Sequence, residues 1–136
     1  MEIYKHETDI QLRFNDIDML GHVSNSVYQN YFDLARTAYF KQAFSVPINW
    51  KDTALVLASI KIDYKRPIFF DEQVAVLTRV YHLGNKSLKM HQKLINKVSR
   101  EEHAINDAVL VAYDYQNDKA VTLPSMWKEE IGQFER

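Results

Sequence analysis

The chain has 136 residues, of which 46% are hydrophobic and 12% aromatic, and 17 basic against 18 acidic side chains give a net charge of −1. This length predicts a single domain over residues 1–136 with a core of its own. The balanced charge argues against a nucleic-acid or membrane-surface partner, the composition excludes intrinsic disorder, and the absence of Cys excludes disulfides and thiol nucleophiles.

No targeting segment is evident in the sequence. The first residues lack the apolar core of a signal peptide, and no apolar run approaches the ~20 residues that a membrane span needs. These features predict a cytoplasmic protein with no membrane partner.

The first predicted elements are a strand, a loop and a long helix. Apolar and polar residues alternate from Ile10 to Phe14, which is typical of a half-buried strand, and turn-forming residues follow over 15–22. From about Ser24 the apolar spacing becomes helical, and Pro47 closes the region after the helix. The predicted buried positions of the helix are Val27, Tyr28, Tyr31, Phe32, Leu34, Ala35, Ala38 and Tyr39.

Four further alternating runs predict strands in the rest of the chain. Their alternating positions are Ile60, Ile62 and Tyr64; Val74, Val76, Thr78 and Val80; Leu88, Met90, Gln92 and Leu94; and Ile105, Asp107, Val109, Val111 and Tyr113. The connections are short, which requires antiparallel pairing. A short helix is predicted over 125–134, with Trp127, Ile131 and Phe134 on one side. The predicted class is α+β, with one long apolar helix against a curved antiparallel sheet of about five strands.

Asp16 and Asp18 lie just before the long helix, and their spacing leaves several roles open. They could form a general acid/base pair or join His22 in a metal site. One of them could instead supply a base or nucleophile beside the free N–H groups of the helix N-terminus. They could also do no more than cap the helix.

Other polar segments carry weaker signals. Lys65 and Arg66 at one strand end, and Asn85, Lys86 and Ser87 at another, could meet phosphate or form solvated turns. The remaining histidines have no second ligand at a useful spacing. There is no nucleophile-elbow motif and no glycine-rich phosphate loop.

The segment Arg13–Tyr28, RFNDIDMLGHVSNSVY, followed by Tyr31–Arg36, YFDLAR, closely resembles a family motif. Hotdog-fold acyl-CoA thioesterases of the 4-hydroxybenzoyl-CoA thioesterase type carry the pattern R-[FY]-x-D-x-D-x-x-G-H-V-N-N-x-x-Y, then Y-F-E-x-A-R. Ile62–Pro67 and Asp71–Glu72 resemble the strand end and turn that follow in that family. The resemblance covers most of the chain, from about residue 8 to Pro124.

The resemblance implies a hotdog fold and a homodimer or homotetramer with active sites at the dimer interface. It implies that Asp18 is the catalytic carboxylate, either as nucleophile or as general base. Backbone N–H groups within Val23, Ser24 and Asn25 would form the oxyanion hole, without metal or cofactor. The substrate would be an acyl-CoA or an acyl carrier protein thioester, with the CoA phosphates meeting Lys65, Arg66, Asn85, Lys86 and Ser87 from one or both subunits.

Two other functions remain open, and two residues depart from the family pattern. The chain could be a non-catalytic hotdog module that binds an acyl chain or serves in assembly, or a hotdog hydratase, although the Asp–His motif of that class is missing. Ser24 replaces a common Asn, and Asp33 replaces a usual Glu. The residues expected to limit the acyl pocket are Phe40, Phe44, Trp50, Leu55 and Leu57.

Overall fold

The structure is a computed structural model that describes residues 3–136, so Met1 and Glu2 of the predicted domain lie outside the described residues. In chain order its elements are β1 (His6–Ile10), 3₁₀ turns at Phe14–Asp16 and Asn25–Val27, α1 (Tyr28–Ala43), β2 (Thr53–Tyr64), β3 (Val74–Leu83), β4 (Ser87–Asn96), β5 (Glu102–Asp114), β6 (Lys119–Ala120) and α2 (Ser125–Glu135).

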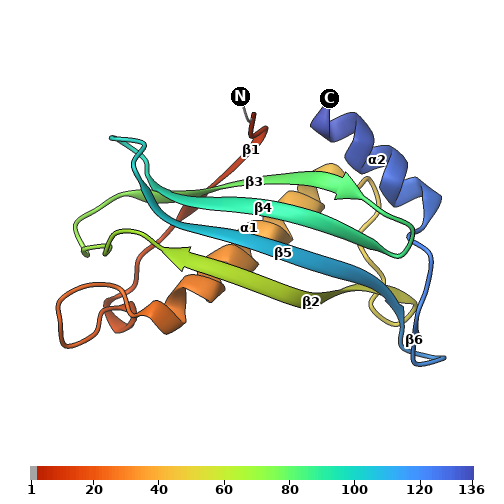
Figure 1. The fold of residues 1–136 in the computed structure, drawn as a ribbon, viewed down its shortest axis with the longest axis horizontal. Helices are drawn as coiled ribbons and strands as arrows, with labels where there is room; N and C mark the ends of the chain where they lie inside the picture. Colours follow the sequence, from red (N-terminus) through yellow and green to blue (C-terminus); the bar gives the residue numbers. More distant parts are fainter. Residues whose placement is uncertain (1–2) are drawn as a thin grey trace.

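The strands form one antiparallel sheet in the order β1-β3-β4-β5-β2, with the short β6 added to β5. Figure 1 shows α1 crossing one face of this sheet, and α2 lying beside the end of β3. The predicted architecture of one long helix against an antiparallel sheet is confirmed. Within residues 3–136 no helix is long and apolar enough to cross a membrane.

The buried face of α1 is close to the one predicted from its spacing. Tyr28, Phe32, Ala35 and Tyr39 are buried, and they lie within a narrow arc because they recur every three to four residues. Leu34 was predicted to lie on this face, but it is 54% exposed. It lies on the opposite side of the helix, since its position is offset from both Phe32 and Ala35 by one or two residues.

Two strands differ from the prediction, the edge strand β1 and the interior strand β5. The first strand ends at Ile10, so Leu12 and Phe14 lie beyond it and Phe14 is 81% exposed. In β5 the predicted apolar set from Ile105 to Tyr113 is only partly buried or exposed. The alternate set faces the core instead, comprising Ala104, Asn106, Ala108, Leu110 and Ala112. Small alanines under the helix allow close packing, and the β-branched residues take the outer face. The apolar sets predicted for β3 and β4 are buried as expected.

A polar network lies inside this otherwise apolar core. Nε2 of Gln92 donates to the carbonyl of Phe32 on α1 at 3.0 Å and lies 3.2 Å from Oγ1 of Thr78 on β3. Nδ2 of Asn106 on β5 donates to Oε1 of Gln92 at 3.0 Å. Because Thr78, Gln92 and Asn106 are almost fully buried, the network fixes where α1 sits over three strands.

We expect Gln92→Ala to lower the free energy of unfolding by roughly 2–4 kcal/mol, because it opens a cavity and leaves the Asn106 amide and the Phe32 carbonyl unsatisfied. Equilibrium urea unfolding measures the loss. Gln73→Ala is the control, since Gln73 is exposed, and it should change stability by less than about 0.5 kcal/mol. Equal stability of the two variants would contradict a structural role for the network.

Candidate active site

Residues 16–24, which we name the Asp18 loop, form a small hairpin directly before the helix. Ile17 and Val23 form an antiparallel bridge, and the N–H of Asp18 donates to the carbonyl of His22 at 3.0 Å. Gly21 closes the turn with φ of 86°, a left-handed conformation in which side chains other than glycine are strained. The tip of the hairpin, Met19 and Leu20, is exposed.

The two aspartates of this loop have different environments. Oδ2 of Asp16 accepts hydrogen bonds from the N–H of Arg13 at 3.0 Å and from the hydroxyl of Tyr31 at 2.6 Å. Asp18 uses only Oδ1, which accepts from the N–H of Leu20 at 2.9 Å and lies 3.9 Å from Nδ1 of His22. Within residues 3–136 its Oδ2 has no hydrogen-bond donor, and its side chain is 35% exposed. Asp16 is therefore a structural anchor, and Asp18 presents a free carboxylate oxygen.

Tyr31 holds Asp16 in place from the first turns of α1. Burial, followed by the hydrogen bond to Asp16, raises the pKa of the Tyr31 hydroxyl well above its ordinary value. The hydroxyl therefore stays protonated and donates to the carboxylate. Because Oδ2 of Asp16 is engaged in this way, Asp16 offers less than Asp18 to the acid/base pair considered from the sequence. The described residues contain no group of three or more His, Cys, Asp or Glu that could hold a metal ion.

Three backbone N–H groups were predicted as oxyanion donors, and two of them are already used. The N–H of Val23 donates to the carbonyl of Ile68 at 2.8 Å, and the N–H of Ser24 donates to the carbonyl of Asp16 at 2.9 Å. These bonds hold the loop in place and correct the expectation for Val23 and Ser24. At the first turn of the helix, the N–H groups of Asn25 and Ser26 have no acceptor within the part of the chain that the structure describes.

A second segment, residues 66–69 between β2 and β3, packs behind the Asp18 loop. Besides Ile68, Phe69 forms a backbone bridge with His22, and their rings meet edge to face at 6.1 Å. The Tyr28 hydroxyl contacts the carbonyl of Arg66 at 3.5 Å. The sequence gives no local sign of these contacts, because each joins residues about 40 positions or more apart.

The five residues predicted to bind phosphate do not gather in one place. Lys65 and Arg66 follow the end of β2, where they pair with Glu102 and Glu101. Asn85, Lys86 and Ser87 form the turn between β3 and β4 at the opposite end of the sheet, as the strand register and Figure 1 show. One subunit therefore does not bring the two groups to one phosphate.

A cavity of about 500 Å³ lies between the C-terminal half of α1, the connection that follows it, and the start of β2. Its lining includes Phe40, Phe44, Trp50 and Leu55, four of the five residues predicted to limit the acyl pocket. Leu57 is not among the lining residues. The walls are largely apolar, which suits a hydrocarbon ligand.

Comparisons with known proteins agree with this architecture. A family model described as the thioesterase-like superfamily matches residues 12–131. The uncharacterized protein YsmA of Bacillus subtilis is 30% identical over 122 residues, which cover 90% of this chain and 82% of that protein. The long-chain acyl-CoA thioesterase FadM of Escherichia coli is 25% identical over 133 residues, which cover 94% of this chain and 98% of that protein.

Among solved structures, a thioesterase from Thermus thermophilus complexed with coenzyme A and Zn matches with a TM-score of 0.84 at 33% identity. The match covers 99% of this chain and 98% of that chain. The hotdog fold and the thioesterase resemblance predicted from the sequence are thereby confirmed.

The separate environments of Asp16 and Asp18 predict effects on stability that differ in size. Asp16→Ala should lower the free energy of unfolding by roughly 1–3 kcal/mol, because the Tyr31 hydroxyl and the Arg13 N–H both lose a charged acceptor. Asp18→Asn keeps an oxygen for Leu20 and should change stability by less than about 0.5 kcal/mol. Urea unfolding of both variants measures the difference, and a larger loss for Asp18→Asn would refute the assignment.

Proposed function

The chain belongs to the thioesterase-like superfamily of thioester hydrolases, and on that premise we propose that it hydrolyses an acyl-CoA thioester to a free acid and CoA. Asp18 is the nucleophile or general base, and N–H groups at the helix N-terminus form the oxyanion hole. One observation carries the proposal. The Asp18 loop supplies a carboxylate with a free oxygen immediately before a helix whose first N–H groups lack acceptors.

The chemistry follows from these two features. The thioester carbonyl oxygen binds at the N–H of Asn25, where N–H dipoles and the positive end of the helix stabilise the charge that develops in the transition state. Asp18 either attacks the carbonyl carbon, giving an acyl-enzyme that water then hydrolyses, or removes a proton from the attacking water. In both routes the C–S bond breaks, and CoA leaves as the thiolate and takes up a proton.

The names of two similar proteins support this substrate class. FadM is a long-chain acyl-CoA thioesterase, and the Thermus thermophilus structure contains coenzyme A. An acyl carrier protein thioester is the variant substrate, and a non-catalytic acyl-binding module is the alternative function. We call the N-terminus of the helix, at Asn25 and Ser26, the helix mouth. A module that only binds acyl chains does not need the free carboxylate oxygen of Asp18 beside it. The cytoplasmic location expected from the sequence stays a prediction.

We further propose that the protein forms a homodimer through β2, which can pair further into a tetramer. β2 is an edge of the sheet and has 12 residues, so it presents a long row of unpaired backbone groups. Edges of this length associate unless they are protected. Antiparallel pairing of two β2 strands about a two-fold axis makes one continuous sheet and satisfies both edges.

This pairing supplies each active site with an acyl pocket from the other subunit. The end of β2 contacts the helix mouth, because the Tyr64 hydroxyl donates to the carbonyl of Asn25 at 3.1 Å, and Leu55 at the start of β2 lines the cavity. Antiparallel pairing sets the end of one β2 beside the start of the other, at the ~4.8 Å spacing of neighbouring strands. Within one subunit Phe40 lies about four helical turns beyond Asn25, or roughly 22 Å.

The same pairing places the Asn85–Ser87 turn of one subunit at the end of the joined sheet where the partner's β2 ends. The two groups of predicted phosphate ligands then lie on one side of the dimer, although they are at opposite ends of one subunit. We therefore assign the CoA phosphates to Lys65 and Arg66 of one subunit together with Asn85, Lys86 and Ser87 of the other.

The first test is hydrolysis of acyl-CoAs from acetyl to palmitoyl and of aromatic acyl-CoAs, with the released thiol followed by a chromogenic reagent. Asp18→Asn should lower kcat at least ~100-fold because it removes the base or nucleophile. Asp16→Asn is the matched control, since it keeps an acceptor for Tyr31 and should lose much less activity. If the wild type cleaves no thioester, or Asp18→Asn is fully active, the proposed function is wrong.

Mixed dimers test whether the acyl pocket comes from the other subunit. Thr37→Trp places a bulky ring at the cavity from an exposed helical position. A dimer of one Asp18→Asn and one Thr37→Trp subunit should retain one working site for palmitoyl-CoA, or about half of the wild-type activity. A dimer of one wild-type subunit and one subunit with both changes should be inactive. A pocket within the same subunit would give the reverse pattern.

A further inference from the structure

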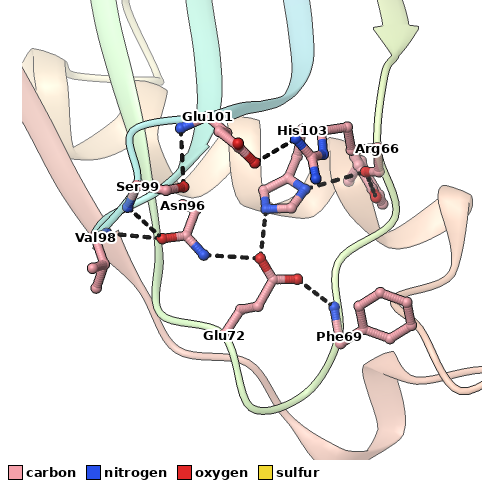
Figure 2. Close-up of polar contacts among 9 residues, drawn as sticks. Arg66, Phe69, Glu72, Asn96, Val98, Ser99, Glu101 and His103 are labelled. Carbon is pink, nitrogen blue, oxygen red and sulfur yellow. Dashed lines mark hydrogen bonds and ion pairs between the residues drawn. The ribbon is translucent and has the colours of Figure 1, made fainter.

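Glu72, in the connection between β2 and β3, lies at the centre of a polar cluster behind the Asp18 loop (Figure 2). Its Oε2 accepts a hydrogen bond from the N–H of Phe69 at 2.7 Å. Its Oε1 accepts from Nδ2 of Asn96 at 2.9 Å and lies 2.9 Å from Nε2 of His103. Burial alone would raise the pKa of Glu72, but the Phe69 N–H, the Asn96 amide and His103 hold that pKa below its ordinary value.

The partners of Glu72 are all donors. The side-chain oxygen of Asn96 accepts from the N–H groups of Val98 and Ser99 at 2.8 and 3.0 Å, so its amide nitrogen must face Glu72. His103 has acceptors at both ring nitrogens, since Nδ1 lies 3.2 Å from the carbonyl of Arg66. The two ring nitrogens of His103 therefore face two acceptors, the Arg66 carbonyl and the carboxylate of Glu72.

The contact between Glu72 and His103 is buried, and its burial limits how much it stabilises the fold. The His103 side chain is 4% exposed and that of Glu72 is 19% exposed. Removing the Glu72 carboxylate from water costs free energy that its hydrogen bonds must offset, so the contact contributes little net stability compared with apolar packing. What the pair does supply is geometry, because each partner is fixed in direction by several hydrogen bonds.

Glu72 and His103 act on the segment 66–69. His103 holds the Arg66 carbonyl through Nδ1, and its own carbonyl accepts from the N–H groups of Lys65 and Arg66 at 2.8 and 3.2 Å. Glu72 holds the N–H of Phe69. The segment is therefore tied to β5 through His103 and to the end of β4 through Asn96.

The segment in turn holds the Asp18 loop. The Ile68 carbonyl accepts from the N–H of Val23, two residues before Asn25, and Phe69 forms the backbone bridge with His22. The contacts are thus continuous from the sheet to the helix mouth. We propose that Glu72 and His103 are positioning residues, which set the place of the helix-mouth N–H groups and of Asp18 through the segment 66–69.

The kinetic consequence rests on the function proposed above. A displaced oxyanion donor weakens transition-state stabilisation more than substrate binding, because the donor matters most when the charge develops. Loss of Glu72 or His103 should therefore lower kcat while leaving KM nearly unchanged.

The test compares wild type, Glu72→Gln, His103→Gln and the double variant in steady-state hydrolysis of an acyl-CoA that the wild type cleaves. Glutamine offers a single oxygen, so it cannot accept from both the Phe69 N–H and the two side-chain donors. Each single change should lower kcat roughly tenfold with KM within about twofold. Because the two residues act as a unit, the double variant should have about the same kcat as the less active of the two single variants. Glu7→Gln is the matched control, since Glu7 pairs with Arg100 and does not touch the segment 66–69.

Hydrogen exchange followed by mass spectrometry separates positioning from general loss of stability, and it needs no activity. Glu72→Gln should speed exchange at least about fivefold in peptides covering residues 17–25 and leave peptides of β3 and β4 at the wild-type rate. Equal acceleration in all peptides, or a wild-type rate at 17–25, would overturn the proposal. If the wild type cleaves no acyl-CoA, the proposed function fails while the exchange result still decides the positioning role.

Discussion

The hydrogen bond from the N–H of Val23 to the carbonyl of Ile68 is the contact on which the candidate site depends. Both residues are fully buried, so water cannot replace either partner if the bond breaks. An unsatisfied buried backbone group costs about 1–3 kcal/mol, which keeps the base of the Asp18 loop in one place. The tip of the same loop, Met19 and Leu20, is exposed. The loop thus combines a rigid base with a tip that is open to a ligand.

The proposed chemistry uses the polar groups that the fold leaves unpaired. Folded proteins pair nearly all of their polar groups, and around this loop the rule holds for Asp16, Val23 and Ser24. Exceptions include Oδ2 of Asp18 and the N–H groups of Asn25 and Ser26, which have no hydrogen-bond partner among the described residues. Water satisfies such groups cheaply at an open surface. In the proposed reaction a bound thioester would exclude that water, and each dipole would then act more strongly on the developing charge.

The sequence predicts the local features of this structure well and the long-range contacts poorly. The helix and the strands β2 to β5 follow from periodicity, and the interest in Asp18 follows from a motif within about 25 residues. The first strand was predicted too late in the chain, since β1 shares only Ile10 with it. The inward face of β5 does not, because the choice between alanines and β-branched residues depends on how closely α1 packs. The contacts of Tyr31 with Asp16, Val23 with Ile68, and Glu72 with His103 join distant parts of the chain, and no local pattern contains them. His103 in particular is an ordinary strand residue by spacing, although it is nearly fully buried.

The helix mouth is held from two directions, and this links chemistry to assembly. From the end of the sheet, the segment 66–69 holds Val23 and Tyr28. From the edge, Tyr64 packs its ring on Tyr28 at 5.0 Å and donates its hydroxyl to the carbonyl of Asn25. Tyr64 is the last residue of β2, the strand through which we propose the dimer forms. Pairing of β2 would fix the backbone of Tyr64, and its side chain would carry that constraint to Asn25. A monomer would therefore lack more than the partner's acyl pocket, because one of the two supports of its oxyanion donor would rest on an unpaired edge strand.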